Sequence, residues 1–201
     1  MAKLYFSYAA MNAGKSTILL QASYNYRERG MNTMLFTSAL YAENGVGLIS
    51  SRLGVSSEAE LYTGETDLLA RVRSAHQQAP ISCVFVDEAQ FLTAEQVWQL
   101  ARVADRLRIP VMCFGLRTDF QGKLFPGSSE LLAIADVLRE VRTICHCGAK
   151  ATMVVRQDAE GHALTQGDQV SIEKTVYVSL CRRHWEEETG HWPLAGTAHD
   201  H

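Results

Sequence analysis

The chain reads Ala9-Ala10-Met11-Asn12-Ala13-Gly14-Lys15-Ser16-Thr17 directly after a strand-like segment, and it continues into a helix-like segment. Backbone N–H groups of such a turn can wrap a polyphosphate at a helix N-terminus, where the helix dipole also favours negative charge. In this pattern the Lys15 ammonium reaches the β- and γ-phosphates, and the Ser16 hydroxyl ligates Mg²⁺. The pattern therefore predicts a phosphate site formed by Ala9, Ala10, Met11, Asn12, Ala13, Gly14, Lys15 and Ser16.

Apolar, strand-like segments alternate with amphipathic, helix-like segments on both sides of this loop. The expected strands cover residues 3–8, 33–37, 83–86 and 111–115, and the expected helices cover residues 15–29, 67–76 and a segment that begins at Thr93. Strands that are apolar throughout are typical of a parallel sheet covered on both faces. We therefore predict an α/β fold, a P-loop (RecA-like) parallel sheet with helices on both faces. Residues 41–64 are polar and are expected to form a long functional loop.

Two adjacent carboxylates, Asp87 and Glu88, end the buried segment Val84-Phe85-Val86. Ligands of open parallel sheets bind at the carboxyl ends of the strands. Asp87 is therefore predicted to hold Mg²⁺ together with Ser16. Glu88 would project to the other side of the pleat, toward an attacking nucleophile. The pair alone does not distinguish a kinase from an ATPase, because the same Glu88 could activate water.

Three of the five cysteines lie in polar sequence near the C-terminus, in Cys145-His146-Cys147-Gly148 and Cys181-Arg182-Arg183-His184. Four sulfur or nitrogen ligands are typical of a closed structural zinc site. Alternate residues of an extended strand face the same side, so both sulfurs of the Cys-x-Cys pair can reach one ion. The predicted ligands are Cys145, Cys147, Cys181 and His184, whereas His146 is expected to point away.

The composition changes after Ile144, and this change suggests a second domain. We expect a nucleotide-binding domain at residues 1–144, a zinc-binding β-ribbon lid at 145–190 and a disordered tail at 191–201. The chain has 201 residues and a net charge of −3, with no apolar run of membrane-spanning length and no block of Lys or Arg. This pattern predicts a cytoplasmic protein that binds neither membranes nor nucleic acid.

Taken together, these features resemble the type II (cytosolic-type) thymidine kinases, and the bacterial branch of that family in particular. The resemblance runs from residue 1 to about residue 187. The segments that carry it are Met11-Asn12-Ala13-Gly14-Lys15-Ser16, Val86-Asp87-Glu88-Ala89-Gln90-Phe91, Gly115-Leu116-Arg117-Thr118-Asp119-Phe120 and Tyr177-Val178-Ser179-Leu180-Cys181-Arg182.

The resemblance implies transfer of the γ-phosphate of ATP to the 5′-hydroxyl of thymidine, with Mg²⁺ and a structural Zn²⁺. It implies that Glu88 accepts the proton, and that a homotetramer is inhibited by dTTP. The implied ATP contacts are residues 9–16, Asp87, Glu88, Ala89, Gln90 and Arg52, and the implied thymidine contacts are Leu116, Phe120, Val170, Ile172 and Tyr177.

The sequence departs from the family pattern at two places. Ala9 stands where the standard loop has its first glycine, so the φ angle of Ala9 must stay negative. The expected base-binding lasso at residues 170–177 lacks the usual Gly-Gly pair.

Two other functions are compatible with parts of this pattern. A P-loop ATPase would use Glu88 to polarise water, but a lid that excludes water suits a kinase better. A zinc-ribbon nucleic-acid module would need basic and aromatic residues side by side, which this sequence does not show.

Overall fold

The structure is a computed structural model that describes residues 1–42, 45–169 and 176–190. The described chain forms two compact units, which interleave along the sequence. The first unit comprises Met1–Ala9, Ala13–Arg117 and Leu124–Val141; the second comprises Ala10–Asn12, Thr118–Lys123 and the described residues from Arg142 onward. The predicted tail at 191–201 lies outside the described residues. No helix in the described ranges is long and apolar enough to cross a membrane.

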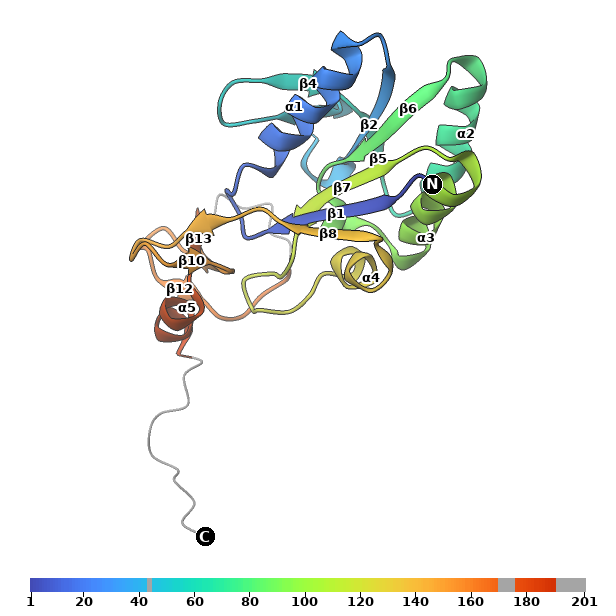
Figure 1. Ribbon diagram of the computed structural model, residues 1–201. Coiled ribbons are helices and arrows are strands. Elements are labelled where there is room, and N and C mark those ends of the chain that lie inside the picture. The colour runs from blue at the N-terminus through green and yellow to red at the C-terminus, as the bar shows by residue number, and fades with distance from the viewer. Residues whose placement is uncertain (43–44, 170–175, 191–201) are drawn as a thin grey trace. The chain divides into compact units, whose positions relative to one another are not determined.

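A six-stranded parallel sheet organises the first unit (Figure 1). Its strand order is β5-β2-β6-β7-β1-β8, and every neighbouring pair is parallel. The predicted α/β class with a parallel sheet is therefore confirmed. The strands are β1 (Leu4–Ala9), β2 (Asn32–Ser38), β5 (Glu60–Tyr62), β6 (Ile81–Val86), β7 (Val111–Leu116) and β8 (Val137–Glu140).

Helices cover both faces of this sheet, as its apolar strands require. One face packs against α1 (Lys15–Glu28), whose buried Leu19 and Leu20 join Phe85 and Phe114 in one apolar cluster. The other face packs against α2 (Leu68–Gln78), α3 (Ala94–Arg102) and α4 (Pro126–Ile134), which share the larger cluster. Figure 1 shows α1 on one side of the strands and α2, α3 and α4 on the other.

The helix starts follow from local sequence. The Asp67 side chain accepts a hydrogen bond from Ala70 N–H at the start of α2. At the start of α3, Thr93 and Gln96 form a capping box, with each side chain bonded to the other's backbone. A π-helical turn, Val103–Leu107, extends α3 and ends at Arg108, whose φ is positive.

Residues 41–64 contain more regular structure than their polar composition indicates. After the 3-10 turn η1 (Ala39–Tyr41), an antiparallel hairpin pairs β3 (Leu48–Ser50) with β4 (Ser56–Glu58). Ile49 is buried in the cluster under α1, and β5 adds an edge strand to the main sheet. Strands of three residues give too short a period to be recognised in the sequence.

The second unit contains the predicted β-ribbon. A three-stranded antiparallel sheet, β12-β11-β13, is built from β11 (Met153–Gln157), β12 (Ala163–Leu164) and β13 (Val176–Leu180). The short pair β9 (Thr143–Ile144) and β10 (Lys150–Ala151) precedes it. A helix that we did not predict, α5 (Arg182–Thr189), follows β13 and buries Trp185 in the small core.

Candidate active site

The carboxyl end of β6 carries the Asp-Glu pair, and the first turn of α1 lies beside it. Ser16 Oγ donates a 2.8 Å hydrogen bond to Asp87 Oδ2. Asp87 itself is fixed, because its N–H donates to the Phe36 carbonyl and its Oδ1 accepts from Glu88 N–H at 3.0 Å. The two predicted magnesium ligands, far apart in sequence, therefore meet. A hydroxyl and a carboxylate are oxygen donors of the kind that Mg²⁺ prefers.

Burial shifts the pKa values of two charged side chains at this edge of the sheet. The pKa of Asp87 is raised to about 6, chiefly because the side chain is buried and because the Glu88 carboxylate lies close; the hydrogen bond from Ser16 opposes this rise. Burial also lowers the pKa of the Lys15 ammonium, an effect that the Glu88 and Asp87 carboxylates counteract. A divalent cation and a polyphosphate would supply the opposite charges that this group of buried ions favours.

Glu88 is held by its own backbone and by two buried neighbours. It adopts the left-handed conformation, with φ 53°, which is uncommon for a residue with a side chain. The Tyr62 hydroxyl donates to the Glu88 carbonyl at 2.7 Å, and Gln90 Nε2 donates to Glu88 Oε2 at 2.5 Å. Burial raises the pKa of Tyr62, so this hydroxyl stays a donor. Strained backbone of this kind is often found at functional sites.

Gln90 is anchored in turn by the end of β7. Its Oε1 accepts from Leu116 N–H at 3.0 Å, and the side chain is 1% exposed. A Cβ on Gly115 would lie 2.9 Å from both Gln90 N and Gln90 Oε1, so only glycine leaves room for this contact. The Glu88 carboxylate is thus oriented by a rigid chain of hydrogen bonds through Gln90 to the sheet.

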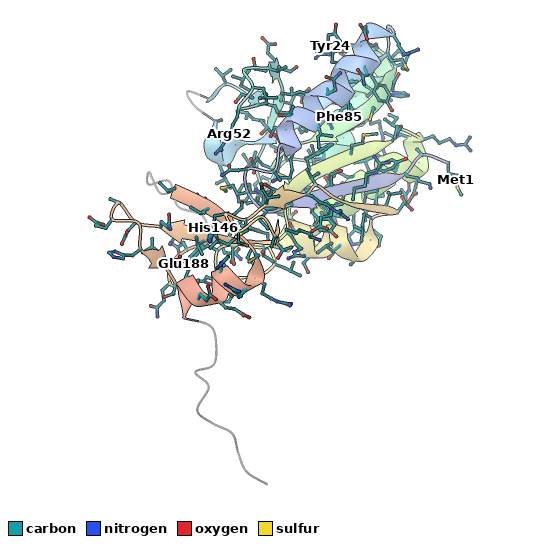
Figure 2. All side chains as sticks on the ribbon, turned by 60° about the vertical axis from the view of Figure 1, so that its left-hand side comes forward. Met1, Tyr24, Arg52, Phe85, His146 and Glu188 are labelled. Carbon is teal, nitrogen blue, oxygen red and sulfur yellow. The ribbon has the colours of Figure 1, made fainter. Side chains whose placement is uncertain are left out.

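A pocket of about 490 Å³ opens beside these residues. Ser16, Asp87 and Glu88 line it together with Thr37, Ser38, Ala42, Val46, Leu48, Ile49 and Ser50. The β3–β4 hairpin that the sequence did not reveal thus forms one wall. Arg52, labelled in Figure 2, is exposed on the turn of that hairpin and is not among the lining residues.

The phosphate loop has two left-handed residues before α1, Asn12 with φ 64° and Gly14 with φ 83°. Ala9 still belongs to β1 and has no positive φ, so its Cβ is tolerated, as the sequence required. Ala10–Asn12 belong to the second unit. There Ser179 Oγ donates to the Met11 carbonyl at 2.5 Å, and Asn12 Nδ2 donates to the Tyr177 carbonyl at 3.4 Å.

The expected thymidine contacts are distributed over both units. Leu116 ends β7 in the first unit, whereas Phe120 and Tyr177 belong to the second. Phe120 is buried under the Arg156 guanidinium, whose carbon lies 4.0 Å from the ring centre, and its carbonyl accepts from Trp185 Nε1 at 3.1 Å. Val170 and Ile172 lie outside the described residues, so their expected contacts remain predictions.

The four expected zinc ligands converge in the second unit. The ligand atoms of Cys145, Cys147, Cys181 and His184 all lie within 4.8 Å of one another. Cys147 Sγ is 4.0 Å from Cys181 Sγ, and His184 Nδ1 is 3.3 Å from Cys145 Sγ. A tetrahedral ion with sulfur bonds of about 2.3 Å separates its ligands by about 3.5–3.8 Å. The donor set and its spacing therefore fit zinc.

The surroundings of the cluster fit a metal site as well. A tight turn, closed by Gly148 N–H on the Cys145 carbonyl, presents both sulfurs of the Cys-x-Cys pair. His184 Nε2, on the far side of the ring from Nδ1, lies 3.7 Å from Glu187 Oε2. A carboxylate facing the second ring nitrogen is the usual partner of a metal-binding histidine. The His146 ring stacks on His184 at 4.3 Å between centres and is not part of the ligand group.

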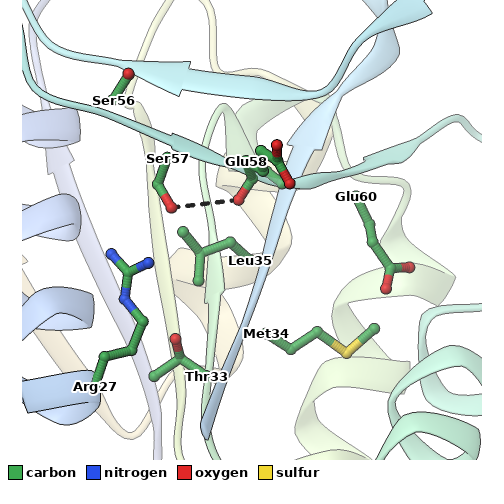
Figure 3. A pocket seen from close by; sticks show the side chains of 9 residues that line it. Arg27, Thr33, Met34, Leu35, Ser56, Ser57, Glu58 and Glu60 are labelled. Atoms are coloured by element: carbon green, nitrogen blue, oxygen red, sulfur yellow. Dashed lines mark hydrogen bonds between the residues drawn. The ribbon is translucent and has the colours of Figure 1, made fainter.

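A second, larger pocket is lined by none of the predicted catalytic or metal-binding residues. It measures about 570 Å³ and lies between the C-terminal part of α1, the first half of β2 and the segment around β4, as Figure 3 shows. Its lining includes the exposed Arg27, Ser56, Glu58 and Glu60, but no predicted site residue.

Some supporting residues could not be recognised from the sequence. Tyr62 lies in a segment that was expected to be an irregular loop, and its bond to Glu88 joins β5 to β6. Arg156 is buried in an apparently ordinary strand, where it donates to the carbonyls of Asp168 and Gln166 at 3.0 and 3.2 Å. No local pattern indicates either contact, because both partners are distant in sequence.

Comparison with known proteins agrees with the site. A family model described as thymidine kinase matches residues 2–185. A thymidine kinase of Mesorhizobium japonicum is 70% identical over 190 residues, which cover 94% of each chain. A thymidine kinase of Agrobacterium fabrum is 65% identical over 93% of this chain and 97% of its own length. A thymidine kinase of Yersinia pestis is 58% identical over 93% of this chain and 96% of its own.

Proposed function

Because the chain belongs to the thymidine kinase family, we propose that it transfers the γ-phosphate of ATP to the 5′-hydroxyl of thymidine. The observation that best supports this proposal is the position of Glu88, which lines the same pocket as Ser16 and Asp87. Such an arrangement supports a general base beside the proposed magnesium ligands at the carboxyl end of the sheet, as phosphoryl transfer requires.

We assign Glu88 as the group that accepts the proton of the thymidine 5′-hydroxyl. Its carboxylate is oriented by the amide of Gln90, which leaves the second oxygen without that partner. Because Gln90 Oε1 is already bonded to Leu116 N–H, the amide is oriented to donate to Glu88 through Nε2. This donor fixes the orientation of the Glu88 carboxylate, and a general base must be held within hydrogen-bond reach of the proton that it accepts.

We assign Ser16 and Asp87 as the residues that hold Mg²⁺, and residues 9–16 as the site of the ATP phosphates. Bound Mg²⁺ would neutralise charge on the transferred phosphoryl group. Lys15 begins α1, so that its ammonium and the first N–H groups of the helix can face the same anion. Ala89, Gln90 and Arg52 are proposed ATP contacts on the strength of the family pattern alone.

We propose that thymidine binds through Leu116, Phe120, Val170, Ile172 and Tyr177. The described part of the segment before the lasso is anchored within the second unit. Gln169 Nε2 donates to Asp119 Oδ2 at 2.7 Å, and Gln121 Nε2 donates to the Gly167 carbonyl at 3.3 Å. These bonds tie the residues before the predicted lasso to the segment that carries Phe120.

The Cys₃His cluster is proposed to bind one structural zinc ion that holds the ribbon together. Four protein ligands leave no open position, so the ion would have no part in the chemistry. We propose residues 145–190 as the lid domain and residues 1–144 as the nucleotide domain. A cytoplasmic location is in keeping with the five free cysteines, because thiols stay reduced there.

We further propose a homotetramer that dTTP inhibits. Apolar side chains are exposed on α1 and the β3–β4 hairpin, a feature typical of surfaces that associate: Ile18, Tyr24, Leu48, Leu53 and Val55. For dTTP, the base would suit the nucleoside site and the triphosphate would suit the phosphate loop. Light scattering of the purified protein and inhibition assays test these two points.

The assignment of Glu88 is tested by Glu88→Gln, which keeps the size of the side chain but removes the base. General-base catalysis typically contributes about 10²–10⁴-fold, so single-turnover phosphorylation should slow by about that factor. Binding of ATP and thymidine, measured directly, should change little. The matched control is Glu28→Gln at the far end of α1, about 20 Å from Lys15 along the helix axis. A Glu88→Gln enzyme that reacts as fast as wild type would exclude Glu88 as the base.

A further inference from the structure

Strand β13 lies between two features of the second unit that the proposed function uses. The strand begins at Val176, a few residues after the predicted base contacts Val170 and Ile172, and Cys181 of the metal cluster follows its last residue. The strand is held in place by antiparallel pairing with β11 along its whole length, from Gln157↔Val176 to Met153↔Leu180. A strand fixed in this way couples the position of the predicted base-contact residues before it to that of the cysteine cluster after it.

One face of β13 packs against the small apolar core, and the other face contacts the phosphate loop. Leu180 is buried in the small apolar core of the second unit, and Val178 packs against the same core. Because successive side chains of a strand alternate, Tyr177 and Ser179 project from the opposite face. From that face, Ser179 Oγ donates to the Met11 carbonyl at 2.5 Å. The backbone carbonyl of Tyr177, which lies in the plane of the sheet, accepts from Asn12 Nδ2 at 3.4 Å. Two successive residues of the phosphate loop, Met11 and Asn12, are therefore bonded to β13.

The bond to Met11 has a consequence for the next N–H group. The peptide unit between Met11 and Asn12 is planar and trans, so its C=O and N–H point in opposite directions. With the carbonyl held by Ser179, the Asn12 N–H is turned away from β13. Asn12 has a positive φ of 64°, and Gly14 follows with 83°. Successive N–H groups around residues of this conformation form the concave arrangement that binds anions.

We propose that Ser179 is a positioning residue for ATP, and that its hydroxyl holds the Met11–Asn12 peptide with the N–H directed to the phosphates. The proposal rests on the assignment of residues 9–16 as the ATP phosphate site. It makes β13 the physical connection, within the second unit, from the cysteine cluster to Met11 and Asn12 of the phosphate loop. Ser179 itself touches neither substrate.

The test compares Ser179→Ala with Ser179→Thr, which keeps the hydroxyl and suits a strand. Removing the hydrogen bond should weaken ATP–Mg²⁺ binding roughly two- to tenfold, the factor that one neutral hydrogen bond typically contributes. Three other quantities should stay within about twofold of wild type, at or below the smallest effect expected from losing one hydrogen bond: thymidine binding without ATP, the zinc content, and kcat at saturating ATP. Ser179→Thr should bind ATP–Mg²⁺ as tightly as the wild-type protein does.

The matched control is Thr189→Val, which removes another hydroxyl-to-carbonyl bond of the same unit, the 2.7 Å bond to the Trp185 carbonyl. Lys15→Met, the phosphate-loop variant, separates the two possible failures. If Lys15→Met loses ATP binding and Ser179→Ala does not, the role of Ser179 is refuted and the phosphate site stands. If neither variant affects ATP binding, the phosphate-site assignment itself is wrong. Equal losses of ATP and thymidine affinity in Ser179→Ala would show a structural role and would also overturn the proposal.

Discussion

Replacing Asp87 with asparagine should stabilise the metal-free protein while damaging its site. The Asp87 carboxyl has a pKa of about 6 in the folded protein, against an ordinary value of 3.8. The unfolded chain therefore loses this proton at lower pH than the folded protein does. As pH rises from about 4 to about 6, the wild-type protein loses stability at this site, and the loss is complete above that range.

The size of the effect follows from the pKa difference. About two pKa units correspond to about 3 kcal/mol, which is an upper figure for the cost of ionising Asp87 in the folded state. Asparagine stays neutral, and it can keep both local contacts. Its oxygen can accept from Glu88 N–H, and its amide can donate to Ser16 Oγ, because a hydroxyl accepts as well as donates. We expect Asp87→Asn to gain about 1–3 kcal/mol at pH 7.5 and almost nothing near pH 4.

Urea unfolding followed by circular dichroism, without added magnesium or nucleotide, measures this difference at the two pH values. Asp105→Asn is the matched control, because it removes the same charge from an exposed side chain of the π-helical turn. The Asp105 variant should shift stability by much less. Two results would show that ionised Asp87 does not destabilise the folded protein. One is an Asp87→Asn variant that is less stable than wild type at pH 7.5, and the other is a gain in stability that is the same at both pH values.

Two further predictions concern the phosphate loop and the ribbon. Lys15→Met should fold normally but lose nearly all phosphoryl transfer, because the loop loses the cation that matches the β/γ-phosphate charge; activity within a few-fold of wild type would exclude the loop from the mechanism. Elemental analysis should find one zinc per chain, and Cys181→Ser should lower that content and loosen the ribbon while the parallel sheet still unfolds cooperatively, since metal binding is coupled to local folding. A zinc-free preparation with a protected ribbon in hydrogen exchange would contradict this assignment.

The parts of the fold that the sequence indicates are those with a local signature. The apolar β1, β6 and β7 have no exposed residue and are buried at most positions, and the loop before α1 has a fixed pattern, so periodicity and motif agree. The edge strands β5 and β8 do not show such periods. Each has exposed charged residues, such as Glu60 and Arg139, because one side of an edge strand faces solvent.

The candidate site is predictable to a similar extent. Ser16, Asp87 and Glu88 could be expected to meet, because carboxyl ends of parallel strands share one edge of the sheet. Their supports could not be expected. Tyr62 and Ser179 donate to backbone carbonyls that the fold brings near, and Gln90 links the Glu88 carboxylate to the distant Leu116 N–H. The helix α5 is similarly hidden: it is polar except for Trp185, whose Nε1 is shared between the Phe120 and Val154 carbonyls. Such contacts depend on tertiary structure and leave no period in the sequence.

The proposed thymidine kinase activity can be measured from the product that the purified wild-type chain makes from ATP, Mg²⁺ and a panel of nucleosides. We predict that ATP is consumed at a substantial rate only when thymidine is present, and that mass spectrometry and phosphorus NMR identify thymidine 5′-monophosphate in equal amount to ADP. Hydrolysis of ATP to ADP and phosphate at the same rate with and without thymidine would contradict it, and would show that Glu88 activates water instead.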